Sequence, residues 1–402
     1  MSNDPDLLAR ILGRSLSLFQ ADMEQHRQAL EAAIVRARIL VIGAAGSIGS
    51  AFVEQLLPFS PATIHLIDPS ENNLVELVRT LRSSDQPIPD DFRTFAIAMG
   101  SREFAHFLAS APPYDAVVNF AALKHVRSER DPFTLMRLLH TNVFALQETL
   151  ERLLPTPPQR VFSVSSDKAV LPESVMGASK ACMESILWHY AEWMNCTSAR
   201  FANVAFSDGS LLHGFLRRWE KGQPLSAPED VRRYFISHQE AGQLCLLACF
   251  LGENRDLFVP RLHPDEDLHS FAEIARLFLE AKGYQPIIFH EEEEARAWAR
   301  TMRRENSRSW PCCFSSSDTG GEKMVEQFFS ADERVDFSRY HALGVIPNPP
   351  FTQGRILEET LAWLRRIRRA ETWDRQEIIS ALQQLVPSLP HAHTEKNLDQ
   401  KM

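Results

Sequence analysis

The chain has 402 residues, of which 43 are Lys or Arg and 52 are Asp or Glu, so its formal net charge is −9. This acidic balance argues against a nucleic acid partner, because binding a polyanion requires an excess or a cluster of basic side chains. A composition of 44% hydrophobic and 24% charged residues excludes the disordered class, and the lack of any run of about 18 apolar residues predicts no membrane span.

Residues 1–36 are predicted to be helical, because their apolar residues recur near a 3.6-residue period. We expect the apolar face of this segment either to contact another subunit, as in a homo-oligomer, or to pack on its own domain. Asp4 and Asp6 occupy the region where a secretory signal would be basic. The six cysteines form neither a CxxC nor a Cys/His metal pattern. Both features indicate a cytoplasmic protein without a metal site.

From residue 38 onward, short apolar runs alternate with amphipathic segments, which predicts a mostly parallel sheet with helices on both faces. The predicted strands are residues 38–43, 63–68, 92–99, 115–121 and 160–166. This pattern is typical of an α/β, Rossmann-like, doubly wound domain, and the spacing becomes irregular after about residue 200. We therefore predict a helical segment at 1–36 and an NAD(P)-binding domain at 37–200. A smaller substrate-binding lobe is predicted at 201–350, interleaved with the NAD(P)-binding domain. C-terminal helices with a polar tail are predicted at 351–402.

A glycine-rich motif follows the first predicted strand and opens the next helix. It contains Gly43, Gly46 and Gly49, with Ser47 and Ile48 between the last two glycines. Such glycines permit a tight turn and a close approach of the backbone to a pyrophosphate, which binds at the helix N-terminus. Because a strand precedes the motif and a helix follows it, we interpret it as a dinucleotide-binding turn rather than a turn without a ligand.

Asp68 ends the second predicted strand. A carboxylate at this place accepts hydrogen bonds from the adenosine ribose and repels a 2′-phosphate, which favours NAD over NADP. On weaker grounds we expect the adenine side to be lined by Ser70, Gly100 and Ser101. Ala121 and Ala122 end the fourth predicted strand, where small side chains allow the cofactor to approach the sheet.

Polar residues follow the fifth predicted strand as Ser165-Ser166-Asp167-Lys168, and Met176-Gly-Ala-Ser-Lys180 comes shortly after. Open α/β folds build their sites at the C-terminal ends of parallel strands. Polar side chains there contribute little to packing, so we interpret Ser166, Asp167 and Lys168 as site residues rather than as a surface ion pair.

Seven segments, taken in order, resemble the CapD-like polysaccharide-biosynthesis dehydratases, which are extended short-chain dehydrogenases/reductases that act on UDP-N-acetylhexosamines. They are LVIGAAGSIGSAFVEQLL, NFAALKHV, TNVFALQETL, SSDKAVLPESVMGASKACME, ARFANVAFS, RRYFISHQEA and TGGEKMVEQFF. The resemblance covers roughly residues 36–345, and the SDKAV string followed by Met176–Lys180 is specific to this family rather than to the superfamily.

The resemblance implies a nucleotide-sugar 4,6-dehydration in which NAD(P)⁺ oxidises C4, the C5 proton and the C6 hydroxyl are eliminated, and the hydride returns to C6. It assigns Asp167 as the acid and Lys168 as the base. It also assigns Ser166 to the C4 hydroxyl and Lys180 to the nicotinamide ribose. A lysine base must be neutral, so we expect Lys168 to be partly desolvated or near other cations. Met176 occupies the position of the usual tyrosine, and its thioether cannot accept the C4 hydroxyl proton.

Six residues are expected on the substrate side. Lys124 and His125 directly follow the fourth strand, and the others match family positions near the nucleotide diphosphate or the uridine: Asn203, Arg233, Glu322 and Lys323. An arginine fork suits phosphate oxygens in its geometry. Ala202 and Asp208 depart from the Gly and the Arg that are usual in the family.

Two other functions remain open. A 4-epimerase or reductase on a similar sugar needs no Asp–Lys elimination pair. A non-catalytic NAD-binding scaffold would explain why none of the five tyrosines has a lysine four residues later. The intact set of Asp167, Lys168 and Lys180 favours a dehydratase that binds NAD and a UDP-sugar.

Overall fold

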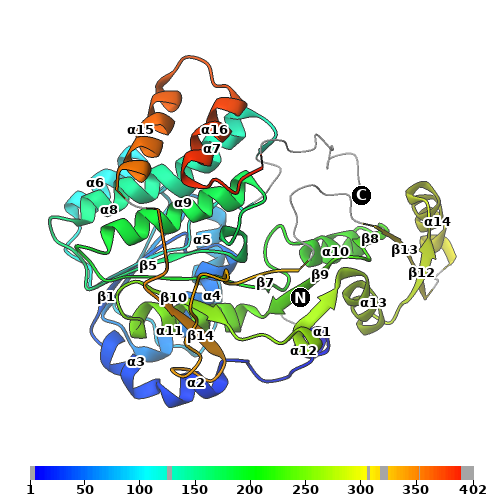
Figure 1. The fold of residues 1–402 in the computed structure, drawn as a ribbon. Coiled ribbons are helices and arrows are strands. Elements are labelled where there is room, and N and C mark those ends of the chain that lie inside the picture. Colours follow the sequence, from blue (N-terminus) through cyan, green and yellow to red (C-terminus); the bar gives the residue numbers. More distant parts are fainter. Residues whose placement is uncertain (1–4, 125–128, 306–307, 317–324, 353, 391–402) are drawn as a thin grey trace.

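The main sheet of the computed structural model has eight strands in the order β14-β10-β6-β5-β4-β1-β2-β3 (Figure 1). The structure describes residues 5–124, 129–305, 308–316, 325–352 and 354–390. Only the pairing of β10 with β14 is antiparallel within this sheet. Its strands are β1 (Arg38–Ile42), β2 (Thr63–Ile67), β3 (Asp91–Phe95), β4 (Ala116–Asn119), β5 (Arg160–Val164), β6 (Cys196–Ala199), β10 (Asp256–Pro260) and β14 (Leu343–Pro347). The predicted Rossmann-like fold is confirmed.

Helices cover both faces of this sheet, because its central strands are apolar on both sides. One face carries α2 (Gln20–Gln25), α3 (Arg27–Ile34), α4 (Ser47–Leu56), α5 (Glu71–Arg82) and α11 (His238–Leu251). The other carries α6 (Arg102–Ser110), α7 (Pro132–Leu139), α8 (Ala145–Leu153), α9 (Val175–Tyr190), α15 (Arg355–Arg369) and α16 (Arg375–Leu385).

The helix predicted after β4 contains a π-helical turn. α7 begins after Asp131, whose carboxylate accepts hydrogen bonds from the first-turn amides. The turn η3 (His140–Phe144) then joins α7 to α8 without a break. The side chain of Asn142 therefore reaches back to the loop after β4, where Leu123 N donates to its Oδ1 and its Nδ2 donates to Leu123 O, both at 2.9 Å.

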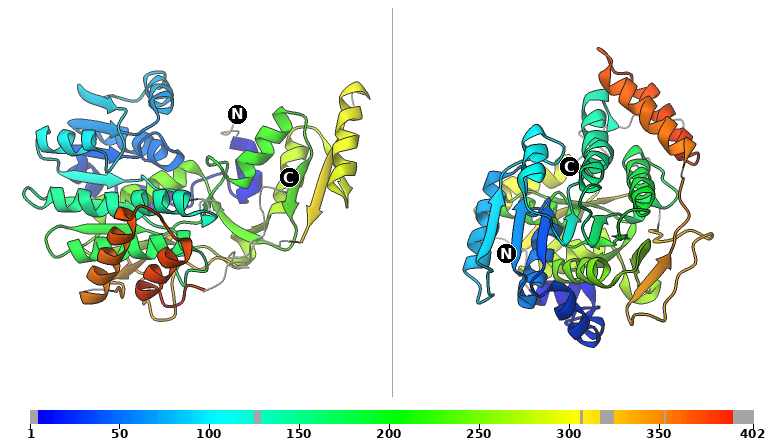
Figure 2. Two further views of the ribbon diagram at one scale, coloured as in Figure 1. Left: turned by 90° about the horizontal axis from the view of Figure 1, so that it is seen from above. Right: turned by 90° about the vertical axis from the view of Figure 1, so that its left-hand side faces the viewer.

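The smaller lobe lies to one side of the main sheet (Figure 2). It contains the three-stranded sheets β11-β9-β7 and β12-β13-β8. Its strands are β7 (Asn203–Val204), β8 (Leu225–Pro228), β9 (Arg232–Ile236), β11 (Leu268–Ser270), β12 (Gln285–Phe289) and β13 (Ser309–Ser315), and its helices are α10 (Leu211–Glu220), α12 (Pro264–Asp267), α13 (Phe271–Ala281) and α14 (Glu292–Glu305). Because β10 and β14 return to the main sheet, the chain passes between the two lobes several times.

The N-terminal segment, predicted to be helical, forms three short helices among the described residues. Helix α1 (Pro5–Leu12) ends at Gly13, whose φ of +69° interrupts the helical backbone. α1 packs in the apolar cluster of the smaller lobe, whereas Phe19 and α3 pack on the main sheet. The apolar face of the segment is thus covered by its own chain.

All six cysteines are free and buried. Within the described ranges, no group of three or more His, Cys, Asp or Glu side chains is arranged to hold a metal ion. Among the helices described, none combines the length and the apolar character that crossing a bilayer requires.

Candidate active site

The glycine-rich turn between β1 and α4 is built for close backbone contact. Gly43 has a φ of +74°, and a Cβ on it would lie 2.6 Å from the amide nitrogen of Ala121. A Cβ on Gly49 would lie 2.2 Å from the carbonyl oxygen of Gly43. A side chain is therefore excluded at both positions. Gly46 is the N-cap of α4, and no side chain in the described structure caps this helix end, so its amide groups remain available to an anion.

Asp68 lies directly behind this turn, where β2 ends. Its Oδ2 accepts a hydrogen bond from Ala45 N at 3.2 Å, and its Oδ1 accepts one from Ser70 N at 2.9 Å. Burial raises the pKa of the Asp68 carboxyl, and these two hydrogen bonds oppose that shift. The carboxylate is thus held in one orientation beside the turn.

The residues expected on the adenine side already have local roles. The hydroxyl groups of Ser70 and Ser101 cap α5 and α6, accepting from Asn73 N and Phe104 N respectively. Gly100, with a φ of +79°, lies against Ala145 and forms part of a cavity of about 250 Å³ that Ser101 also lines. Their contact with a cofactor stays a prediction. The backbone of Ala121 adjoins Gly43, and Ala122 follows it in the same loop.

Ser166, Asp167 and Lys168 form one hydrogen-bonded group in the turn after β5. The Ser166 hydroxyl donates to Asp167 Oδ1 at 2.8 Å and accepts from Lys168 N at 3.2 Å. Lys168 Nζ lies 3.3 and 3.4 Å from the two carboxylate oxygens of Asp167. Asp167 is buried, whereas 37% of the Lys168 side chain is exposed. Lys168 is therefore the member of the pair that is open to an incoming molecule.

Glu326 acts electrostatically on this pair and was not predicted from the sequence. Its Oε1 accepts from Asn203 Nδ2 at 2.6 Å, and its Oε2 accepts from Tyr234 N at 2.8 Å. Burial, and then the charge of Asp167, raise the pKa of the Glu326 carboxyl. The available signal was an acidic residue in the mostly apolar run MVEQFF, because buried carboxyl groups are rare unless they have partners.

Groups of both signs act on Lys168. Burial by itself and the charge of Arg233 would lower the pKa of the Lys168 ammonium, but the carboxylates of Asp167 and Glu326 outweigh them and raise that pKa. The sequence predicted an amine that is partly desolvated or near other cations. Both features are present, but in the free protein the two carboxylates, one of them brought from far along the chain, favour the charged form of Lys168.

Lys180 and Met176 lie on the first two turns of α9. Lys180 Nζ donates to Val164 O at 2.9 Å, and burial lowers the pKa of its ammonium to about 8. The Met176 side chain is buried, and its backbone amide donates to Glu129 Oε1 at 2.8 Å. Asn142 Nδ2 donates to Ser179 Oγ at 3.0 Å, so the π-helical turn steadies the start of α9.

The expected substrate residues belong to two groups. Asn203 and Arg233 lie next to Glu326, and Arg233 acts electrostatically on both Glu326 and Lys168.

Lys124 lies near Asp208 and Lys168, and loss of water around its amine lowers the pKa of Lys124. Asp208 N donates to Ser47 Oγ at 2.9 Å, which links a loop of the smaller lobe to the glycine-rich turn. His125, Glu322 and Lys323 lie outside the described residues.

The chain is similar to one family model and to several known proteins. Residues 39–306 match the family model described as polysaccharide biosynthesis protein. The chain is 32% identical over 256 residues to an uncharacterised membrane protein of Methanocaldococcus jannaschii, covering 62% of this chain and 73% of that protein. It is 32% identical over 230 residues to the capsular polysaccharide biosynthesis protein CapD of Staphylococcus aureus, covering 55% of this chain and 37% of CapD. A UDP-glucose 4-epimerase of Rickettsia prowazekii is 26% identical over 242 residues, covering 56% and 65% of the two chains.

Two solved structures share the fold at low sequence identity. Pen from Bacillus thuringiensis matches with a TM-score of 0.63 and 19% identity, covering 79% of this chain and 89% of Pen. The dTDP-glucose 4,6-dehydratase DesIV from Streptomyces venezuelae, solved with NAD bound, matches with a TM-score of 0.55 and 19% identity, covering 84% of this chain and 99% of DesIV.

Proposed function

This chain belongs to the polysaccharide biosynthesis protein family, and on that premise we propose that it is an NAD-dependent nucleotide-sugar 4,6-dehydratase acting on a UDP-N-acetylhexosamine. The observation that carries the proposal is the Asp167–Lys168 pair at the end of β5, in which the Lys168 side chain is partly exposed and Asp167 is buried. Elimination of water needs a proton acceptor at C5 and a proton donor at the C6 hydroxyl. Epimerisation at C4 needs neither.

The glycine-rich turn fits the pyrophosphate of NAD. Gly43 and Gly49 allow the tight packing of the turn against its own backbone, which a Cβ would prevent. No side chain in the described structure caps the N-terminus of α4, and Asp68 lies where the ribose hydroxyl groups would be bound. When bound, NAD supplies a hydride acceptor for C4 and a hydride donor for C6. The NAD in the solved DesIV structure supports this assignment.

Internal proton transfer would prepare both groups for elimination. In the free protein Lys168 is an ammonium beside the Asp167 carboxylate. A bound sugar would remove water from this pair, and burial favours neutral forms over charged ones. Transfer of the Lys168 proton to Asp167 then yields an amine and a carboxylic acid together. The amine removes the C5 proton, and the resulting ammonium exchanges its protons with solvent before it protonates C5, while the acid protonates the departing C6 hydroxyl.

The C4 hydroxyl proton needs an acceptor other than residue 176, because the Met176 thioether is buried and only weakly accepting. We assign Ser166 to bind this hydroxyl, since its own hydroxyl already bonds to Asp167, and we assign a water held by Ser166 and Lys180 to accept the proton, which later replaces the one that Asp167 gives to the C6 hydroxyl. Lys180, with its pKa lowered to about 8, would hold the nicotinamide ribose.

Incubating the pure protein and NAD with UDP-N-acetylglucosamine and related nucleotide sugars tests this proposal. We expect a product that is lighter by one water and that carries deuterium at C5 when formed in D₂O. A product of unchanged mass would instead support an epimerase, the activity named for the Rickettsia relatives. NAD binding without any turnover would support a scaffold.

We predict that Asp68 sets a preference for NAD over NADP. Asp68→Ala should weaken NAD binding by roughly 10-fold, because a hydrogen bond to a charged group contributes about 1.5–3 kcal/mol. The substitution should also reduce the difference in affinity between NAD and NADP. Titration of the wild type and the variant with each cofactor measures both dissociation constants. Asp68→Asn is the matched variant that keeps an acceptor oxygen without the charge. Tighter binding of NADP than NAD by the wild type would contradict the assignment.

A further inference from the structure

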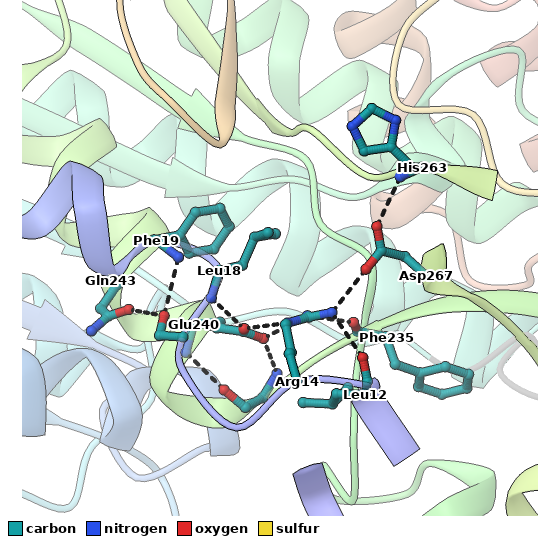
Figure 3. A network of polar contacts seen from close by, with 11 residues as sticks. Leu12, Arg14, Leu18, Phe19, Phe235, Glu240, Gln243, His263 and Asp267 are labelled. Atoms are coloured by element: carbon teal, nitrogen blue, oxygen red, sulfur yellow. Dashed lines mark hydrogen bonds and ion pairs between the residues drawn. The ribbon is translucent and has the colours of Figure 1, made fainter. Parts of the chain in front are cut away.

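The N-terminal segment connects the two lobes of the molecule. Leu7, Ile11 and Leu12 of α1 are buried in the apolar cluster of the smaller lobe. Phe19 and α3 are buried on the main sheet. The chain between these anchors crosses from one lobe to the other and carries Arg14 (Figure 3).

All five N–H groups of the Arg14 guanidinium are used in hydrogen bonds (Figure 3). Nε and Nη2 donate to the two carboxylate oxygens of Glu240 at 2.8 and 3.0 Å. Nη1 donates to Asp267 Oδ1 at 2.9 Å and to Leu12 O at 3.2 Å, and Nη2 also donates to Phe235 O at 3.1 Å. A lysine has only three donors and no planar fork, so it could not reproduce this arrangement.

The two carboxylates held by Arg14 belong to different lobes. Glu240 lies in the first turn of α11, which packs on the main sheet, and its side chain also accepts from Ser237 N and Leu18 N, both at 2.7 Å. Asp267 ends α12 in the smaller lobe and accepts from His263 N at 2.8 Å. A single, partly buried cation therefore bonds to both α11 and α12.

The segments on either side of this contact carry the proposed substrate residues. Phe235, whose carbonyl bonds to Arg14, follows Arg233 and Tyr234 in β9. β11 begins directly after Asp267 and pairs with β9, with His269 opposite Arg233 and Leu268 opposite Tyr234. The amide of Tyr234 in turn holds Glu326 beside the Asp167–Lys168 pair.

We propose that Arg14 is a positioning residue for the nucleotide-sugar site: by joining α11 to α12 it fixes where β9, and with it Arg233 and Glu326, lies relative to Asp167 and Lys168. This inference rests on the proposed function and gives the N-terminal segment a role in substrate binding. The hydrogen bonds of Arg14 within the described structure reach neither the glycine-rich turn nor Asp68, so cofactor affinity should not depend on it.

The test compares the full-length wild type with Arg14→Lys, Arg14→Met and the control Arg10→Met. Arg10 also links α1 to the smaller lobe, but through an exposed ion pair with Glu280 at 3.0 Å. For each variant we would measure the dissociation constants of UDP and of NAD, the KM and kcat for the nucleotide sugar, the melting temperature, and hydrogen exchange of residues 232–236.

We expect Arg14→Lys to raise the dissociation constant of UDP and the KM about tenfold and to speed exchange in β9, with kcat and NAD affinity changed less than about twofold. Arg10→Met should match the wild type in all of these. If Arg14→Met does not fold, Arg14→Lys decides the outcome. A lower melting temperature with unchanged UDP affinity, KM and β9 exchange would show a purely structural role and overturn the proposal.

The outcomes also separate this inference from the proposed function. A wild type that dehydrates the sugar, combined with an Arg14→Lys variant of normal UDP affinity, overturns the positioning role alone. A wild type that binds UDP without turnover, combined with weakened UDP binding by Arg14→Lys, overturns the dehydratase and supports the positioning role. A wild type that binds no UDP overturns both.

Discussion

Lys168→Met is expected to lower kcat for dehydration by about 10²–10⁴-fold, the usual contribution of a positioned acid–base group, while NAD binding stays close to that of the wild type. Lys168 pairs with the buried carboxylate of Asp167, and its own side chain is partly exposed. It is the proposed proton acceptor at C5. Methionine has a similar length but neither accepts nor donates the proton. The measurements are the single-turnover rate, the product mass and deuterium incorporation at C5 in D₂O.

Lys221→Met, at the exposed end of α10, is the matched control because it removes a lysine of the smaller lobe away from the pair. It should leave rate and incorporation unchanged. A Lys168→Met variant that still incorporates deuterium at C5 at the wild-type rate would remove Lys168 from the mechanism.

Glu326→Gln gives a finer test of the same charge cluster. Its carboxylate helps to raise the pKa of Lys168, so removing that charge should lower the pKa of Lys168. The limb of the pH–rate profile that reports Lys168 should therefore move to lower pH. Replacement by an amide also disturbs one of the two hydrogen bonds that Glu326 accepts. A lower rate with an unshifted profile would indicate packing rather than electrostatics.

Lys180→Met is expected to abolish measurable turnover and at the same time to stabilise the fold near neutral pH. Loss of activity follows from the proposed contact of Lys180 with the nicotinamide ribose. The gain in stability follows from burial, which lowers the pKa of Lys180 from 10.5 to about 8. A shift of this size corresponds to about 3 kcal/mol, from which the lost hydrogen bond to Val164 O subtracts about 1 kcal/mol.

The stabilisation by Lys180→Met should depend on pH in a defined direction. Below about pH 8, Lys180 is charged in both the folded and the unfolded state, so the wild type carries the full desolvation cost. Between about 8 and 10.5 the folded protein loses this proton before the unfolded chain does, and the wild type recovers that free energy. Thermal melts of both proteins at pH 6.5 and at pH 9.5, without cofactor, measure the difference. An equal or growing advantage of the variant at the higher pH would contradict the assignment.

The sequence by itself determined the Rossmann-like half of the molecule. Each of its first five parallel strands is a local run, and β1, β2 and β4 are nearly continuous apolar segments bounded by polar or glycine residues. The turn at Gly43 is local in its backbone, whose φ of +74° favours glycine, although the distant backbone of Ala121 excludes a side chain there as well. Asp68 and the Asp167–Lys168 pair were predicted as site residues because they follow parallel strands, whose C-terminal ends meet at one edge of such a sheet.

Only the tertiary structure decided which charges surround Lys168. Glu326 is 158 positions further along the chain, and its carboxyl comes to the site because Asn203 and Tyr234 N hold it there. A prediction from neighbouring residues could not include this second carboxylate, which together with Asp167 raises the pKa of Lys168.

In the N-terminal segment, too, the sequence predicted the helices but not the surfaces on which they pack. Its apolar period predicted helix, but the choice between packing on another subunit and packing on its own chain depended on two surfaces formed by distant segments. Apart from Leu12 O, the partners of Arg14 likewise come from residues 235–267, more than 200 positions away. Local patterns determine helices, strands and turns because they depend on neighbouring residues, whereas the burial and pairing of charges depend on the folded chain as a whole.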